Sequence, residues 1–199
     1  TKTLVAIQDM EIELIESGVT QEAPFIPQKR SREFETLYES LIVNYSSLNR
    51  DNIEYQRPAI LYVLPNNIGN LFGTVEQLMD WKKRVGYDVQ FVSSSNVVNN
   101  RNNLKNYIDD AYENWENPPV HVTIVGDADG SYDIPTWSES YSGYNGEGDH
   151  PYTTLEGNDP YPEVFIGRIS FSTSSHLNTI ISKTVNYESN PYICLLYTS

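Results

Sequence analysis

The stretch Gly157-Asn158-Asp159-Pro160-Tyr161-Pro162-Glu163-Val164-Phe165-Ile166-Gly167-Arg168-Ile169-Ser170 joins an acidic turn directly to a short apolar run. Residues 164–166 are continuously apolar, which is the pattern of a strand buried on both faces, as in a parallel sheet. Pro160 and Pro162 lack backbone N–H donors, so strand pairing is expected to begin only after them. The sequence therefore predicts a parallel strand with carboxylates in the loop at its mouth.

Length and composition indicate one globular domain with a flanking segment. The chain has 199 residues, of which 39% are hydrophobic and 12% aromatic, enough to build a core. Its 27 acidic residues outnumber 13 basic ones, and the net charge of -14 argues against nucleic acid or an anionic membrane surface as a partner. The sequence has no apolar run long enough for a membrane span. Cations and basic substrates are the expected partners.

From Pro58 onward, apolar strand patterns alternate with helical patterns. Strands are expected at residues 59–64, 89–92, 120–125 and 164–169. Helices are expected near residues 74–85, 104–115 and 174–188, the first of them opened by a capping box, Thr74-x-x-Gln77. Residues 131–155 are rich in Gly, Ser, Tyr and Asp and are predicted to form a long functional loop. The pattern predicts an α/β fold, a three-layer, doubly wound parallel sheet of the flavodoxin or caspase type with helices on both faces.

The two ends of the chain differ from this central part. Residues 1–57 carry short alternating apolar pieces and are interpreted as a partial β-rich arm, in which Phe34, Leu37, Tyr38, Leu41 and Ile42 recur at helical spacing. Residues 58–193 are expected to form the main domain. The last six residues, 194–199, are the translation of TGTCTCTTATACACATCT, a sequencing-library adapter, so we expect the protein-encoded sequence to end near Ile193.

Two acidic clusters predict a calcium site. Asp127 and Asp129 follow the third strand, and Asp159 and Glu163 precede the fourth, with the Tyr161 carbonyl between them. Calcium takes six to eight oxygen ligands from carboxylates, carbonyls and water, so these five residues supply the core of such a shell. The alternative interpretation is that they are ordinary solvated turn residues of an acidic protein.

A second enzyme class could use the same aspartates. A strand followed by Asp-x-Asp-Gly-Ser resembles the opening motif of haloacid dehalogenase-type phosphatases, in which Asp127 would be the nucleophile and Asp129 the acid/base, working with magnesium. The context differs, because Gly126 separates the motif from its strand and a long segment precedes it.

The histidines and Arg168 are better explained by structural roles. His121 is expected on a strand and His176 at a helix start, whereas His150, beside Asp149, is a weaker ligand candidate. Arg168 lies inside a strand and is expected to pair with a carboxylate or to hold loop carbonyls. Neither a Ser-His-Asp nor a Cys-His constellation can be assembled from the sequence.

Taken together, several motifs resemble the gingipain family of cysteine peptidases over residues 34–190. They are Val125-Gly126-Asp127-x-Asp129, Ile134-Pro135, the run from Gly157 to Ser170, a helix ending in Tyr187-Glu188, and the Asp80-Trp-Lys-Lys-x-x-Gly86 segment. The run containing Gly-Arg-x-Ser is the most specific of them.

The resemblance implies a secreted or cell-surface endopeptidase with a caspase-like catalytic domain of two subdomains. This chain is similar to the first, structural, calcium-carrying subdomain, and Asp159-x-Tyr161-x-Glu163 is similar to one of its ligand segments. The family's catalytic His and Cys belong to the second subdomain, and Cys194 does not match the nucleophile. The implied partners are protein or peptide substrates and the missing second subdomain. A non-catalytic adhesin or secretion-associated protein that keeps the fold is the alternative.

Overall fold

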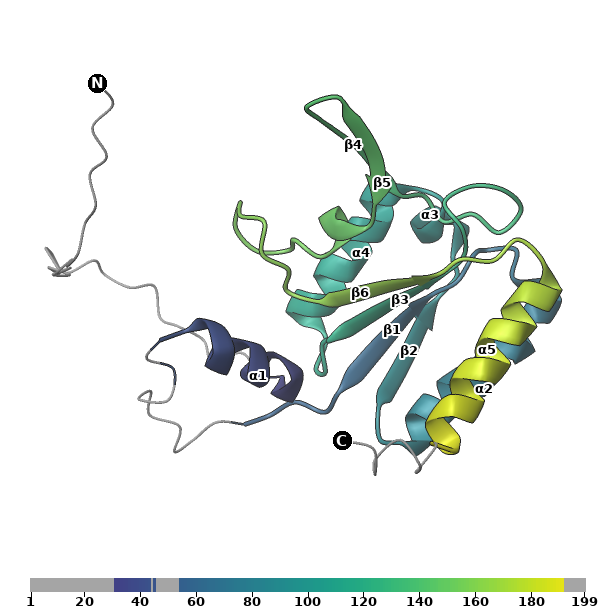
Figure 1. Ribbon diagram of the computed structural model, residues 1–199, viewed down its shortest axis with the longest axis horizontal. Helices are drawn as coiled ribbons and strands as arrows, with labels where there is room; N and C mark the ends of the chain where they lie inside the picture. Colours follow the sequence, from purple (N-terminus) through teal and green to yellow (C-terminus); the bar gives the residue numbers. More distant parts are fainter. Residues whose placement is uncertain (1–30, 44, 46–53, 192–199) are drawn as a thin grey trace, which may run out of the picture.

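A four-stranded parallel sheet forms the centre of the computed structural model, which describes residues 31–43, 45 and 54–191 (Figure 1). Its strands are β1 (Ala59–Val63), β2 (Asp88–Val92), β3 (His121–Val125) and β6 (Phe165–Ile169), in the order β2-β1-β3-β6. Every neighbouring pair is parallel. The doubly wound α/β prediction is therefore confirmed, whereas most of the predicted arm and the 194–199 tail lie outside the described residues.

Helices cover both faces of this sheet (Figure 1). One face packs against α2 (Phe72–Arg84) and α5 (Ser174–Ser189), and the other against α3 (Ser95–Val98) and α4 (Arg101–Asn114). The alternation of side chains along β1 explains the two cores, because Ile60 and Tyr62 join the α2–α5 side while Leu61 and Val63 join the α4 side. All of β1 is buried, as expected for a central parallel strand.

The helix α2 (Phe72–Arg84) begins two residues before the predicted capping box. After the short 3-10 turn η2 (Gly69–Leu71), α2 begins at Phe72, without a side-chain cap. The capping-box prediction at Thr74 is therefore wrong; its hydroxyl instead donates to the Asn178 Oδ1, 2.8 Å away on α5. The expected stop after α2 is confirmed, since Gly86 adopts φ +104 immediately beyond the helix.

Residues 131–155 contain more structure than the predicted loop. They include an antiparallel hairpin of β4 (Trp137–Tyr141) and β5 (Tyr144–Gly148), followed by the 3-10 turn η3 (His150–Tyr152). Ile134 and Tyr152 are fully buried in the core on the α4 side. The prediction was wrong here because isolated apolar anchors in a polar segment produce no periodicity.

The helix α1 (Arg32–Leu41) lies beside the start of β6, at the edge of the sheet (Figure 1). Its formation confirms the helical spacing predicted for this part of the arm. Its Phe34 ring stacks on Phe165 with 4.5 Å between ring centroids. The Phe165 side chain remains 37% exposed. The predicted burial of this strand on both faces is therefore wrong within the described structure, where β6 is an edge strand whose residues are exposed or half-buried.

Candidate functional site

The two predicted acidic clusters lie at opposite ends of neighbouring strands. In the parallel register of β3 and β6, His121 pairs with Phe165 and Val125 with Ile169. Asp127 and Asp129 follow the carboxyl end of β3, whereas Asp159 and Glu163 precede the amino end of β6. A strand of this length separates its two ends by about 13 Å. The structure thus places the two clusters at opposite ends of the β3–β6 pair.

The Asp127 cluster is organised as a turn. The Asp127 carboxylate Oδ1 accepts the Ala128 backbone N–H at 2.9 Å. Its own backbone N–H donates to the Tyr132 carbonyl at 3.2 Å, and its carbonyl accepts the Ile134 N–H at 2.8 Å. Asp129 is exposed at the tip. These contacts match the turn-forming role that was the alternative interpretation of these residues.

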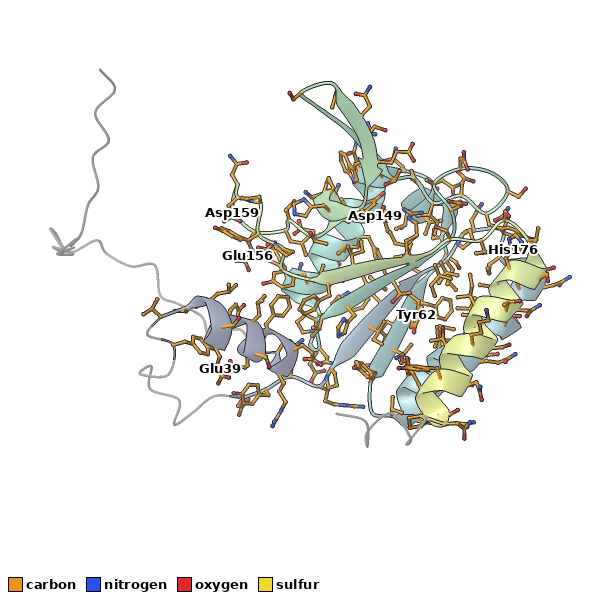
Figure 2. All side chains as sticks on the ribbon, viewed as in Figure 1. Glu39, Tyr62, Asp149, Glu156, Asp159 and His176 are labelled. Atoms are coloured by element: carbon orange, nitrogen blue, oxygen red, sulfur yellow. The ribbon has the colours of Figure 1, made fainter. Side chains whose placement is uncertain are left out.

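Backbone N–H groups hold both carboxylates of the Asp159–Glu163 segment. The Glu163 Oε2 accepts the backbone N–H groups of Leu155 at 2.6 Å and of Glu156 at 3.3 Å, while the Asp159 Oδ1 accepts the Tyr161 N–H at 2.9 Å. Figure 2 shows Glu156 and Asp159 in the same loop. Glu156 was not among the sequence candidates, because only the tertiary contact with Glu163 reveals it.

Glu156 is linked to α4 through a phenol. Its Oε1 accepts the Tyr112 hydroxyl at 2.9 Å. Burial, followed by the hydrogen bond to Glu156 and the negative charges of Glu156 and Glu163, raises the pKa of Tyr112 well above its ordinary value. The phenol is therefore a neutral donor to the Glu156 carboxylate. Within the described ranges no three acidic, histidine or cysteine side chains are close enough to hold a metal ion together.

Arg168 on β6 holds three points of the segment that joins β3 to β6. Its guanidinium donates to both carboxylate oxygens of Asp149, at 2.8 and 2.7 Å, and to the carbonyls of Gly126 and Ile134, at 3.2 and 2.9 Å. Both side chains of the ion pair are largely buried. The Thr136 hydroxyl donates to the same carboxylate at 2.9 Å. Both expected roles of Arg168, carboxylate pairing and carbonyl capping, are confirmed.

The buried side chain of Tyr152 contacts the same segment between β3 and β6. Its hydroxyl donates to the Pro135 carbonyl at 2.6 Å, and its ring meets Trp137 edge-on at 6.0 Å. Burial, with the charge of Asp149 adding to it, raises the pKa of Tyr152 to about 12. The hydroxyl therefore stays protonated at neutral pH and donates to the Pro135 carbonyl.

Each histidine makes structural contacts. His121 stacks on Phe165 at 5.4 Å and meets Tyr87 edge-on, and burial lowers its pKa. The His150 Nε2 lies 3.0 Å from the Pro160 carbonyl, and the His176 Nδ1 lies 3.1 Å from the Ser172 hydroxyl. Cys194 lies outside the described residues, so the described part of the chain has no thiol and no nucleophile–base pair of the Cys-His type.

Across residues 31–43, 45 and 54–191, no helix combines the length and apolar character that crossing a membrane requires.

Comparison with curated proteins identifies relatives of defined activity. The chain is 28% identical to Gingipain R2 of Porphyromonas gingivalis strain ATCC 33277 over 159 residues, which cover 79% of this chain and 20% of the relative. It is also 28% identical to Gingipain R1 of Porphyromonas gingivalis, covering 79% of this chain and 15% of the relative. The chain thus spans a fifth or less of the length of these relatives.

Solved structures agree with the sequence relationship. The complex of Porphyromonas gingivalis RgpB pro- and mature domains matches with a TM-score of 0.55 and 27% identity, covering 65% of this chain and 29% of that one. The Arg-specific cysteine proteinase gingipain R (RGPB) matches with a TM-score of 0.55 and 26% identity, covering 70% of this chain and 30% of that one. The fold is therefore shared with part of a cysteine proteinase.

The phosphatase alternative, with Asp127 as nucleophile, is overturned by a family match that spans most of the domain. The model of Peptidase family C25 matches residues 53–195, which include the Asp127 turn and the whole parallel sheet. The matched range also includes Arg168 with its partners Asp149, Gly126 and Ile134, hereafter the Arg168 cluster. We conclude that this chain belongs to peptidase family C25.

Proposed function

We propose that this chain is the structural first subdomain of a gingipain-like cysteine endopeptidase, secreted or held at the cell surface, and that its parent protein cleaves protein or peptide substrates. The family match over residues 53–195 carries the proposal. The catalytic His and Cys are proposed to lie downstream of this chain. In this proposal the Arg168 cluster stabilises the fold and does not take part in the reaction.

The chemistry of a thiol peptidase explains why we assign this chain a supporting role. Such an enzyme needs a thiolate nucleophile, a histidine within hydrogen-bond reach, and donors for the oxyanion. His121, His150 and His176 are each engaged by aromatic rings, a carbonyl or a hydroxyl in the described structure. The isolated chain is accordingly proposed to be inactive as a peptidase and as a phosphatase.

We further propose that structural calcium binds at the amino end of β6 alone, at Asp159, the Tyr161 carbonyl and Glu163. The position of Asp159 and Glu163 in one loop and the exposure of Asp159 support this assignment. The described geometry fits a calcium shell only in part, because Glu163 and Asp159 each have an oxygen already occupied by backbone N–H groups. Asp127 and Asp129 are not proposed as ligands of the same ion, since they lie beyond the far end of the strand.

The test of the peptidase proposal uses the natural protein, read beyond residue 193, in parallel with the present chain. Fluorogenic peptides ending in Arg or Lys are the substrates, peptides ending in Glu are the control, and a thiol-alkylating reagent is the inhibitor. We expect the natural protein to cleave the basic peptides in a thiol-dependent manner and the present chain to stay at background. A natural protein that never cleaves in reductant and calcium would favour the adhesin alternative, and turnover by the present chain would overturn the supporting role.

A further inference from the structure

The strand β5 contains an asparagine followed directly by glycine, Asn145-Gly146. This is the only place in the amino-acid sequence where glycine follows asparagine. Glycine has no Cβ, so its backbone nitrogen is poorly shielded and the backbone around it rotates easily. An asparagine side chain that precedes glycine can therefore react with the backbone more readily than any other asparagine side chain of the chain.

This asparagine lies in the part of the molecule that is least tied to the core. The β4–β5 hairpin projects from the body of the molecule and forms a two-stranded sheet separate from the parallel sheet (Figure 1). Its base is held, because Thr136 Oγ1 lies 3.0 Å from the Gly148 carbonyl oxygen and 2.9 Å from the Asp149 carboxylate. Asn145 lies beyond this base and is exposed. Since a two-stranded hairpin is only marginally stable by itself, this outer part can open while the base stays closed.

A cross-strand contact restrains Asn145 while the hairpin is closed. Ser140 is its direct partner in the register of β4 and β5, so the two side chains lie on the same face. The Ser140 hydroxyl donates to the Asn145 Oδ1 at 2.5 Å. Reaction of the side chain with the Gly146 nitrogen requires rotation of the backbone between the two residues, which a paired, extended strand does not permit. The closed hairpin thus protects the amide, and opening exposes it.

We propose that Asn145 is a deamidation site whose reaction is controlled by opening of the β4–β5 hairpin. In the open hairpin the Gly146 backbone nitrogen attacks the Asn145 Cγ and forms a new C–N bond, which closes a succinimide ring. The bond from Cγ to the side-chain nitrogen breaks, and that nitrogen leaves as ammonia with the proton that the Gly146 nitrogen loses. Water then adds to one of the two ring carbonyls, and the ring opens to aspartate or isoaspartate.

Both products change the outer part of the hairpin. Either one adds a negative charge near Glu147, in a chain that already carries a net charge of -14. Isoaspartate also adds one atom to the backbone of β5, which disrupts the pairing of β4 and β5 beyond Asn145. Because contacts of Thr136 and the Arg168 cluster hold the base, the change is confined to the hairpin, and the fold of the parallel sheet is retained.

The first experiment incubates the natural protein at mildly alkaline pH and follows its peptides by mass spectrometry, which detects the replacement of an amide by a carboxyl group. Fragmentation by electron transfer distinguishes aspartate from isoaspartate. We expect Asn145 to react before Asn158, which is also exposed but is followed by aspartate. Gly146→Ala should abolish the modified peptide over the same incubation. An Asn145 that keeps its amide, or reacts no faster than Asn158, would overturn the proposal.

The second experiment tests control by the hairpin through the Ser140 contact. Ser140→Ala removes the hydroxyl that holds Asn145, and we expect deamidation to become roughly two- to tenfold faster, the factor that corresponds to one hydrogen bond. Ser138→Ala is the matched control, because Ser138 is also exposed and lies two residues earlier on the same face of β4. It should leave the rate unchanged. Equal rates in the wild type and both variants, or a slower reaction in Ser140→Ala, would contradict control by the hairpin.

Discussion

Arg168 and Asp149 form a two-point ion pair, with Nε 2.8 Å from Oδ2 and Nη2 2.7 Å from Oδ1. The pair joins the β6 strand to the end of the β4–β5 hairpin, and the same guanidinium holds the carbonyls of Gly126 and Ile134. Both side chains are largely shielded, with 13% and 16% of their surfaces exposed. The planar fork of arginine is suited to this geometry, which a lysine cannot reproduce.

Removing the carboxylate of this pair should destabilise the fold strongly. Asp149→Ala leaves a largely buried guanidinium without its partner, and we expect a loss of about 3 kcal/mol in the free energy of unfolding. Arg168→Lys should also destabilise, because it cannot serve Asp149 and both carbonyls together. Urea denaturation followed by circular dichroism measures both effects.

The exposed Lys83–Asp80 pair provides the control. Its side chains are 53% and 52% exposed, and its contact distance is 3.3 Å. Asp80→Ala should therefore change the free energy of unfolding by no more than about 0.5 kcal/mol. Similar losses for Asp149→Ala and Asp80→Ala would mean that the shielded pair has no special structural role.

Gly126 should tolerate no side chain. A Cβ at this position would lie 2.6 Å from the Tyr132 carbonyl oxygen, which belongs to the backbone and cannot move away freely. We expect Gly126→Ala to destabilise by about 1–3 kcal/mol, as for overpacking of a tight interior. In Gly73→Ala, by contrast, the new Cβ meets nothing within 4 Å inside α2, and the substitution should stabilise by about 0.5–1 kcal/mol. Thermal melts of the two variants should shift in opposite directions.

His121 should make stability fall on acidification. Burial lowers its pKa below the ordinary 6.5, with Lys82 acting in the same direction and Glu33 opposing it. The unfolded chain therefore binds a proton at higher pH than the folded chain does, and stability decreases as the pH falls below about 6.5. His121→Phe keeps a ring against Phe165 and should remove this component of the pH dependence. His176→Gln, on an exposed histidine, is the control, and identical pH profiles for all three proteins would contradict the assignment.

Calcium should stabilise the chain through the loop before β6. At a hundredfold excess over its dissociation constant, a ligand that binds only the folded state adds about 2.7 kcal/mol. Asp159→Asn should remove most of the calcium-dependent shift in melting temperature, as should Glu163→Gln. Asp129→Asn should retain the full shift, because Asp129 lies at the opposite end of β3 and β6. A shift abolished by Asp129→Asn and kept by Asp159→Asn would move the site to the other end of the sheet.

The sequence was sufficient to predict the sheet because its strands are continuous apolar runs. Each β1 residue is buried, and the predicted strand 59–64 agrees closely with β1 (Ala59–Val63). The α4 stripe was equally clear, since Leu104, Ile108 and Ala111 recur at helical spacing and are buried. These patterns depend only on local periodicity, which the amino-acid order contains directly.

The arrangement of the acidic groups could not be predicted in the same way. Asp127 and Glu163 flank sequence-adjacent strands of the sheet, but one follows its strand and the other precedes its own, so parallel pairing separates them. The connection between Glu156 and Tyr112 depends on a contact between an α4 residue and a distant loop, which has no local pattern. The role of Arg168 could be predicted, because a charged side chain within an apolar strand is buried and therefore requires a polar partner.

The Arg168 cluster also has a consequence for the order in which the protein folds. The β1–α2–β2 unit is local, whereas β3 and β6 are separated by residues 126–164, so their pairing requires closure of a long loop. We therefore expect β6 to join the sheet late, with formation of the guanidinium contacts as one of the final steps. Arg168→Lys should then mainly accelerate unfolding and barely slow refolding in stopped-flow experiments. A variant that refolds slowly but unfolds at the wild-type rate would instead place β6 in the folding nucleus.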